Sequence, residues 1–205
     1  MSETKRLSIF PLPGAILFPG LQLPLHIFEQ RYRDLVGSAL AKDRLIGMVQ
    51  PQRSGEGSPL YEVGCLGRIG DVEAMEDGRY NIVLEGETRF RVLRELDVTT
   101  AFRQVEAELI DDPQNEALAS VERAGFEFEA KRFAAMQGYS VDWDSVERLD
   151  DETLINGVAQ IAPFDSAAKQ ALLEANSLSE RCELMIQLMQ FFALRDDGDE
   201  IVTLQ

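Results

Sequence analysis

The spacing of apolar residues changes at Pro113, and this change does most to limit what the chain can fold into. Before Pro113, short runs such as Leu45–Val49 and Val105–Leu109 are apolar throughout or alternate apolar with polar, as β-strands do. After Pro113, apolar residues recur at helical spacing. Pro113 itself has no N–H for a ladder and ends the last strand. The sequence therefore predicts an α+β protein with a β part at residues 1–112 and an α-helical part at residues 113–205.

The β part contains several short strands at even spacing and one helix, which favours a small, partly closed barrel. A hairpin turn is predicted at Asp77-Gly78, because Gly78 tolerates positive φ. A second turn is predicted at Glu85-Gly86-Glu87, between strands at Arg79–Leu84 and Arg89–Leu96. The inserted helix is indicated by an apolar stripe formed by Phe28, Tyr32, Leu35, Val36, Ala39 and Leu40.

The helical part is predicted to begin with a long helix at about residues 115–137. A second helix is capped by Asp150 or Asp151, and a third by Asp165 or Ser166. The capping box Ser177-Leu178-Ser179-Glu180 starts a last helix that runs through Leu194. Residues 196–200 then form an acidic stop, so the sequence predicts a helical bundle with an acidic C-terminal tail.

The net charge of −16 is placed unevenly along the chain. Residues 1–110 hold 13 Lys and Arg against 16 Asp and Glu, a net of −3, whereas residues 111–205 hold 7 against 20, a net of −13. Such a surface repels phosphate backbones, so we expect no nucleic-acid partner. No run approaches the ~18–20 apolar residues of a membrane span, so we expect no membrane partner and a cytoplasmic, soluble protein.

The chemistry-bearing residues do not form a convincing reaction centre. Cys65 and Cys182 are far apart and read as reduced core thiols, and with one histidine they cannot build a zinc site. Ser166 and Lys169 match S-x-x-K, but the partner motifs of serine acyl-transferases are absent. The chain also lacks the G-x-x-x-x-G-K-[ST] phosphate loop. We expect no enzyme, no cofactor and no metal.

His26 keeps two interpretations open. It could act as a general base oriented by Glu29, or it could hydrogen-bond buried backbone at a strand end, which its apolar neighbours favour. We also expect Glu29, Arg31 and Arg89 to form a partly buried ion-pair network between helix and barrel.

The last predicted helix is apolar nearly all round, which is unusual for a terminal helix. It either runs through the middle of the bundle or contacts a partner, a second copy or a bound peptide. We therefore take Met185, Met189, Phe191 and Phe192 as candidate polypeptide-binding residues.

Phe18-Pro19-Gly20, followed by Leu23-Pro24-Leu25-His26-Ile27-Phe28-Glu29 and Arg31-Tyr32, resembles the start of the N-terminal substrate-binding domain of Lon proteases. Further matches follow in order: Gly47-Met48-Val49, Tyr61–Gly64, Gly67-Arg68-Ile69, Asp77–Ile82, Gly86, Arg89-Phe90, Ala168–Glu174, Arg181 and Leu184. The resemblance covers nearly the whole chain. We read Pro19, Gly20, Pro24, His26, Glu29, Arg31, Tyr32, Gly86 and Arg89 as its structural signature.

The resemblance implies a PUA-like pseudo-barrel followed by a helical subdomain, and a role in binding exposed apolar or unfolded polypeptide. Lon proteases also carry an ATPase module and a Ser-Lys peptidase module, which these 205 residues lack. We therefore expect a free-standing, non-catalytic bacterial binding protein, with a protease or a second copy of itself as further partner. Two alternatives stay open: a small-molecule or modified-residue reader of the cereblon type, and an RNA binder, which the net charge opposes.

Overall fold

The computed structural model describes residues 4–55, 57–111 and 116–196. Its contacts divide the chain into two compact units. Met1–Asp112 and Asp165–Glu174 form the first, here the barrel unit, and Pro113–Phe164 and Ala175–Gln205 form the second, here the helical unit. The α+β architecture predicted from the sequence is confirmed. The predicted acidic tail beyond Asp196 lies outside the described residues.

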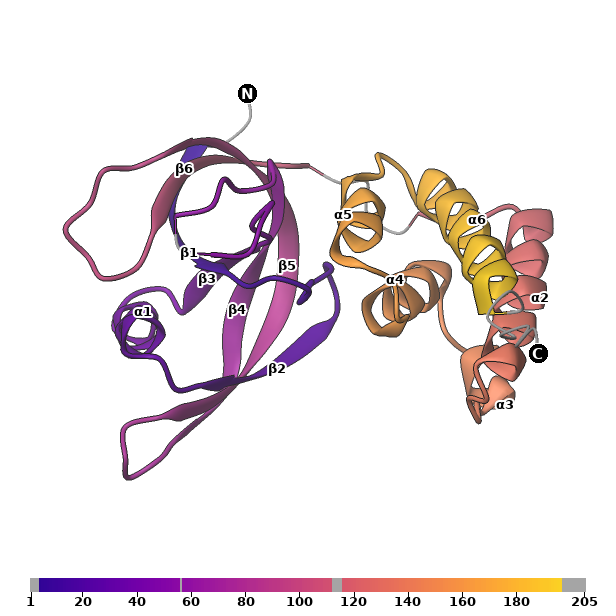
Figure 1. Cartoon of the computed structure of the whole chain (residues 1–205), viewed down its shortest axis with the longest axis horizontal. Coiled ribbons are helices and arrows are strands. Elements are labelled where there is room, and N and C mark those ends of the chain that lie inside the picture. Colours follow the sequence, from indigo (N-terminus) through magenta and orange to yellow (C-terminus); the bar gives the residue numbers. More distant parts are fainter. Residues whose placement is uncertain (1–3, 56, 112–115, 197–205) are drawn as a thin grey trace, which may run out of the picture. The chain divides into compact units, whose positions relative to one another are not determined.

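The barrel unit is a mixed sheet that closes on itself (Figure 1). Its ring consists of β1 (Thr4–Pro11), β3 (Leu45–Val49), β4 (Val63–Ala74), β5 (Tyr80–Glu95) and β6 (Gln104–Leu109). Closure arises because β6 pairs with both β1 and β5. A further strand, β2 (Gln22–Ile27), pairs antiparallel with the first half of β5 and forms an edge of the sheet. Pro24, which cannot donate to a ladder, is compatible with such an edge strand.

The predicted turn at Glu85-Gly86-Glu87 is wrong, because β5 runs unbroken from Tyr80 to Glu95. Gly86 does not reverse the chain. It admits a neighbouring segment instead: Gly86 N–H donates to Leu21 O (2.8 Å), and Gly20 N–H donates to Gly86 O (2.9 Å). Gly20 has a φ of 77° in the turn after Phe18-Pro19. The signature glycines at 20 and 86 therefore hold one close backbone contact between that turn and β5.

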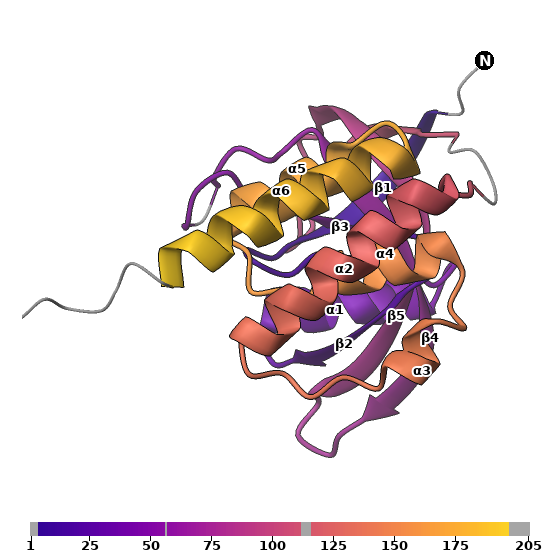
Figure 2. The ribbon, with the colours of Figure 1, turned by 90° about the vertical axis from the view of Figure 1, so that its right-hand side faces the viewer.

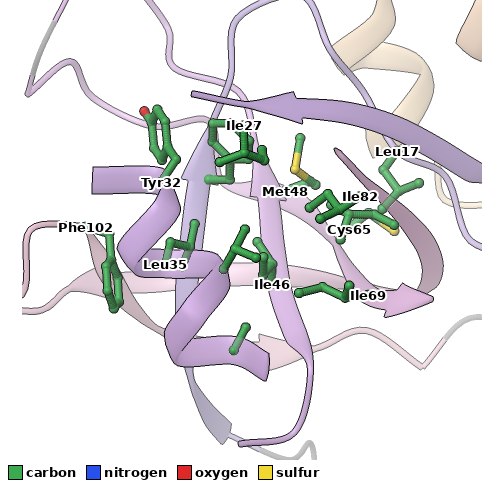
Figure 3. Close-up of a cluster of buried hydrophobic side chains, with 14 residues drawn as sticks. Leu17, Ile27, Tyr32, Leu35, Ile46, Met48, Cys65, Ile69, Ile82 and Phe102 are labelled. Atoms are coloured by element: carbon green, nitrogen blue, oxygen red, sulfur yellow. The ribbon is translucent and has the colours of Figure 1, made fainter. Parts of the chain in front are cut away.

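One buried cluster of the barrel unit lies between α1 (Gln30–Leu40) and the strands, as Figure 3 shows, and a second includes Ile9, Phe90 and Val105 of the strands. Tyr32 and Leu35 of α1 belong to the first cluster, as do Ile46 and Ile82 from the sheet and Phe102. The Tyr32 and Phe10 rings pack with centroids 4.1 Å apart. The helix begins two residues after Phe28, which is 61% exposed and does not join the predicted apolar stripe.

α5 (Ser166–Glu174) belongs to the barrel unit, whereas the sequence-based boundary at residue 112 placed it with the other helices. Buried polar groups explain the difference. Gln170 Nε2 donates to Val63 O of β4 (3.0 Å), and Gln50 Nε2 donates to Gln170 Oε1 (3.1 Å). Arg89, which is also buried, donates from Nη1 to Leu173 O (2.6 Å). These bonds connect α5 to strand residues and to Gln50 more than 80 residues away in sequence.

The helical unit contains α2 (Ser120–Met136), α3 (Trp143–Val146), α4 (Asp151–Ile161) and α6 (Leu178–Asp196). α2 and α6 lie side by side, and α4 also contacts α6 (Figure 2). The predicted caps are present: Asp150 accepts from Thr153 N–H (2.9 Å) and Ser177 from Glu180 N–H (3.1 Å). In the described part of the chain, no helix is both long and apolar enough to cross a membrane.

Candidate functional site

An apolar cleft of about 770 Å³ opens in the helical unit between α2, α3 and α4. We call it the helical cleft. Its floor includes Phe126, Phe133 and Met189, which are almost completely buried. Large apolar side chains at its rim stay open to solvent: Tyr139 is 52%, Leu149 40% and Ile161 80% exposed. A hollow with an apolar floor and an exposed apolar rim is suited to bury apolar groups of a ligand.

Two aspartates fix the walls of the helical cleft by capping helices. Asp142 accepts from Ser145 N–H (3.3 Å) at the start of α3, and Asp150 caps α4. Hydrogen bonds from Ser145 lower the pKa of Asp142, and the backbone N–H of Thr153 lowers that of Asp150. Both carboxylates are therefore ionised at neutral pH, the form that caps a helix N-terminus best.

Arg123 holds α2 against the segment that leads into α4. Its guanidinium donates to Glu127 Oε1 and to Asp151 Oδ1, each at 2.6 Å, and to Leu149 O at 3.1 Å. All four groups belong to the helical unit. Charge-assisted bonds of this kind are strong and also fix the relative orientation of the groups that they join. The bonds of Arg123 therefore set the width of the cleft between α2 and α4.

Of the predicted polypeptide-binding residues, only some are accessible. Met185 is completely buried inside the helical unit and has no surface to offer a polypeptide. Met189 is buried too, but it contributes to the floor of the helical cleft. Phe192 packs against Phe164 with ring centroids 5.1 Å apart, while Phe191 is 53% exposed. The apolar character of α6 therefore comes partly from its position in the middle of the helical unit.

The sequence pattern did not identify the other cleft residues. Tyr139, Trp143 and Leu149 lie between the helix predicted at about residues 115–137 and the helix predicted to start at Asp150 or Asp151. Gly138 has positive φ (70°) just after α2. Trp143 could have indicated a binding surface from the sequence, because it is the single tryptophan of the chain and lies in a segment too polar to form a core by itself.

His26, for which the sequence leaves two interpretations open, hydrogen-bonds an exposed side chain on a neighbouring strand. His26 is exposed on β2, where its Nδ1 donates to Asn81 Oδ1 on β5 (2.7 Å). Asn81 Nδ2 in turn donates to Glu73 Oε2 on β4 (2.8 Å). These three side chains form a surface hydrogen-bond chain across neighbouring strands.

The expected buried network of Glu29, Arg31 and Arg89 is wrong. Glu29 pairs with Arg31, two residues along the chain, at 2.9 Å, and both side chains are more than one third exposed. Arg31 also covers the Tyr32 ring, with its guanidinium carbon 4.8 Å from the centroid. Arg89 is buried and bonds α5 instead. The charges at 29 and 31 thus act locally at the start of α1.

Glu29→Ala is therefore expected to lower the free energy of unfolding by about 0.5 kcal/mol or less, since exposed ion pairs contribute little. Urea denaturation of the variant measures this. Glu62→Ala, which breaks the exposed pair with Arg91 (3.4 Å), is a matched control and should behave alike. A loss of more than about 2 kcal/mol at Glu29 alone would restore the idea of a buried network.

Comparison with known proteins identifies the family. A model described as the ATP-dependent protease La (LON) substrate-binding domain matches residues 6–190. Lon protease 2 of Syntrophobacter fumaroxidans is 31% identical over 181 residues, covering 83% of this chain and 22% of that protein. Lon protease 2 of Myxococcus xanthus is 28% identical over 193 residues, covering 89% of this chain and 23% of that protein. The chain thus spans less than a quarter of the length of these relatives.

Solved structures agree on the fold. A Lon N-terminal domain protein from Xanthomonas campestris superimposes with a TM-score of 0.68 at 22% identity, covering 91% of this chain and 98% of that chain. The N-terminal domain of a Mycobacterium avium complex Lon protease gives the same values. Together with the family match over most of the sequence, these findings establish that the chain belongs to the Lon substrate-binding domain family.

Proposed function

We propose that this protein binds exposed apolar stretches of unfolded polypeptide in the helical cleft, and that it does so without catalysis. The observation that carries the proposal is the cleft itself, with buried Phe126, Phe133 and Met189 below an exposed rim. Membership of a substrate-binding domain family supports it. Two buried cysteine side chains that form no disulfide among the described residues fit a reducing compartment, so the proposal places the protein in the cytoplasm.

The energetics of such a site are adequate for reversible capture. Burying one large apolar side chain contributes roughly 1.5–3 kcal/mol, so three or four side chains in the cleft offset the cost of ordering a flexible segment. The expected dissociation constant is in the micromolar range, which corresponds to a binding free energy of about −8 kcal/mol. This suits a module that must accept many sequences and release them.

The test is a fluorescence-anisotropy titration with a labelled, unstructured peptide of about 20 residues that carries four Leu or Phe. Ile161→Glu puts a charge on the rim of the cleft and is expected to weaken binding about tenfold, or about 1.4 kcal/mol. Val121→Glu is the matched control. Val121, on α2 of the same unit, is about as exposed (77%) as Ile161 but does not line the cleft. It should leave affinity within about twofold.

Two outcomes would overturn the proposal. One is the absence of saturable binding at tens of micromolar for the unaltered protein. The other is an equal effect of the two substitutions, which would move the binding surface away from the cleft. A separate experiment, a pull-down read for unfolded clients and protease subunits, shows whether the protein works with a protease or with a second copy of itself.

A second candidate function rests on a smaller cleft of about 460 Å³ in the barrel unit. Tyr32 and Phe102 supply apolar surface there, and Arg103 pairs with Glu95 through two bonds of 2.6 and 2.7 Å. Mixed aromatic and charged walls suit a small molecule or a modified side chain better than a long apolar segment. A thermal-shift screen tests this reader function, and a flat response across a broad library opposes it.

A further inference from the structure

Carboxylates are neighbours in sequence of several residues that line the helical cleft. The stretch from α3 into α4 contains Asp142, Asp144, Glu147, Asp150, Asp151 and Glu152, against a single basic residue, Arg148. These acids alternate with residues that face the cleft, since Trp143, Val146 and Leu149 line it. Asp142, Asp144, Glu147 and Asp150 are exposed. The apolar floor is thus bordered on this side by negative charge.

Not all of these carboxylates are available to a ligand. Asp142 and Asp150 cap α3 and α4, and Asp151 is bound by Arg123. Asp144 follows the cleft residue Trp143 in the first turn of α3, and Glu147 follows the cleft residue Val146 at the C-terminal end of that helix. They are the two exposed carboxylates of this stretch that neither serve as a helix N-cap nor bind Arg123, so recognition of a cation would depend on them.

The protein already holds one ammonium group at this place. Lys131 of α2 lies with Nζ 5.5 Å from the centroid of the Trp143 ring and 3.8 Å from Glu147 Oε1. An aromatic face beside a carboxylate is a favourable position for a cation. Lys131 and Glu147 are both about half exposed, so this intramolecular contact is open to exchange with a cation from outside.

From the cleft, its acidic border and this cation position, we infer that the helical cleft prefers apolar polypeptide segments flanked by lysine or arginine over segments flanked by acidic residues. The inference rests on the proposed function and names its substrate class. The apolar part of the segment occupies the cleft, and a flanking cation lies near Trp143, Asp144 and Glu147. Charge complementarity of this kind discriminates between ligands through repulsion of the wrong one as much as through attraction.

The experiment compares three labelled peptides with one apolar core and two lysines, two glutamates or two serines at each end. At low salt the lysine peptide is expected to bind about tenfold more tightly than the glutamate peptide, with serine between them. At about 0.5 M salt the difference should fall to about threefold or less, because such charges are then largely screened. Lys131→Met should strengthen binding of the lysine peptide further, because it removes the internal competitor.

A matched pair of double variants separates a local effect from the overall charge. Asp144→Asn with Glu147→Gln removes two carboxylates at the cleft, and Asp71→Asn with Glu76→Gln removes two exposed carboxylates from the barrel unit. Only the first double variant is expected to reduce the preference for lysine, by at least about threefold. Equal reductions in both would overturn the inference in favour of a general effect of net charge.

The outcomes also distinguish this inference from the function on which it rests. If all three peptides bind equally well, the preference is refuted while polypeptide binding stands. If none of them binds, the proposed function fails and the preference fails with it. Tighter binding of the glutamate peptide would contradict the preference directly.

Discussion

Replacing Gly86 by alanine is expected to destabilise the barrel unit by about 3 kcal/mol or more. A Cβ at this position would lie 2.8 Å from the Phe18 carbonyl carbon and would overlap the Phe18 carbonyl oxygen. Both obstacles are backbone atoms, so no side-chain rotation relieves the clash. The substitution would also strain the paired bonds between Gly86 and the turn at Leu21 and Gly20. Urea denaturation followed by circular dichroism measures the loss.

Gly37→Ala is the matched control for this result. Gly37 lies inside α1, and a Cβ there would meet nothing within 4 Å. Alanine is the better helix former, so this variant is expected to gain roughly 0.5–1 kcal/mol. If Gly86→Ala were as stable as the unaltered protein, the close backbone contact between the Phe18–Leu21 turn and β5 would be excluded as a requirement of the fold.

Gln170→Leu is expected to lower the free energy of unfolding by roughly 2–4 kcal/mol. The side chain of Gln170 is buried, donates to Val63 O and to Glu174 Oε1, and accepts from Gln50. Leucine fills a similar volume but leaves Val63 O and the Gln50 amide short of partners, and each buried polar group that loses its partner costs about 1–3 kcal/mol. Hydrogen exchange of the α5 amides should accelerate more than that of the strands.

Gln187→Leu provides the comparison, because Gln187 is an exposed glutamine on α6. The same change of side chain is expected to alter stability by about 0.5 kcal/mol or less there. A small effect at both positions would mean that α5 is held by apolar packing alone. Faster exchange throughout the protein, without any excess in α5, would point to global unfolding instead of release of this helix.

Local signals in the sequence predicted most of the secondary structure. Alternation identified β6 through Val105 and Ala107, and Asp150 and Ser177 marked helix starts, because these patterns depend on neighbours a few residues away. The same alternation could have placed His26 correctly: it faces away from buried Ile27, its neighbour on β2. Its apolar neighbours in sequence were misleading, because adjacent strand residues point to opposite faces.

Features that depend on distant partners were not predictable in this way. Gly86 resembled a turn residue, and only the approach of Phe18 shows why a glycine is needed in the middle of a strand. Trp143 and Ile161 carry no motif, and they become parts of one cleft only when α3 and α4 are placed beside α2. The family resemblance supplied the fold, but it gave no position for the cleft.

The membership of α5 in the barrel unit has a consequence for how this protein is made. All six strands have been synthesised once the ribosome has passed Leu109, yet Gln50 must wait for Gln170, a partner 120 residues later in the chain. During that interval the Gln50 amide and the Arg89 guanidinium lack the α5 groups that bury them, so the nascent barrel cannot reach its final stability. Contacts of such sequence separation also slow folding. Maturation of the N-terminal unit is thereby delayed until much of the helical unit has emerged, and the two halves of the chain are coupled in time as well as in sequence.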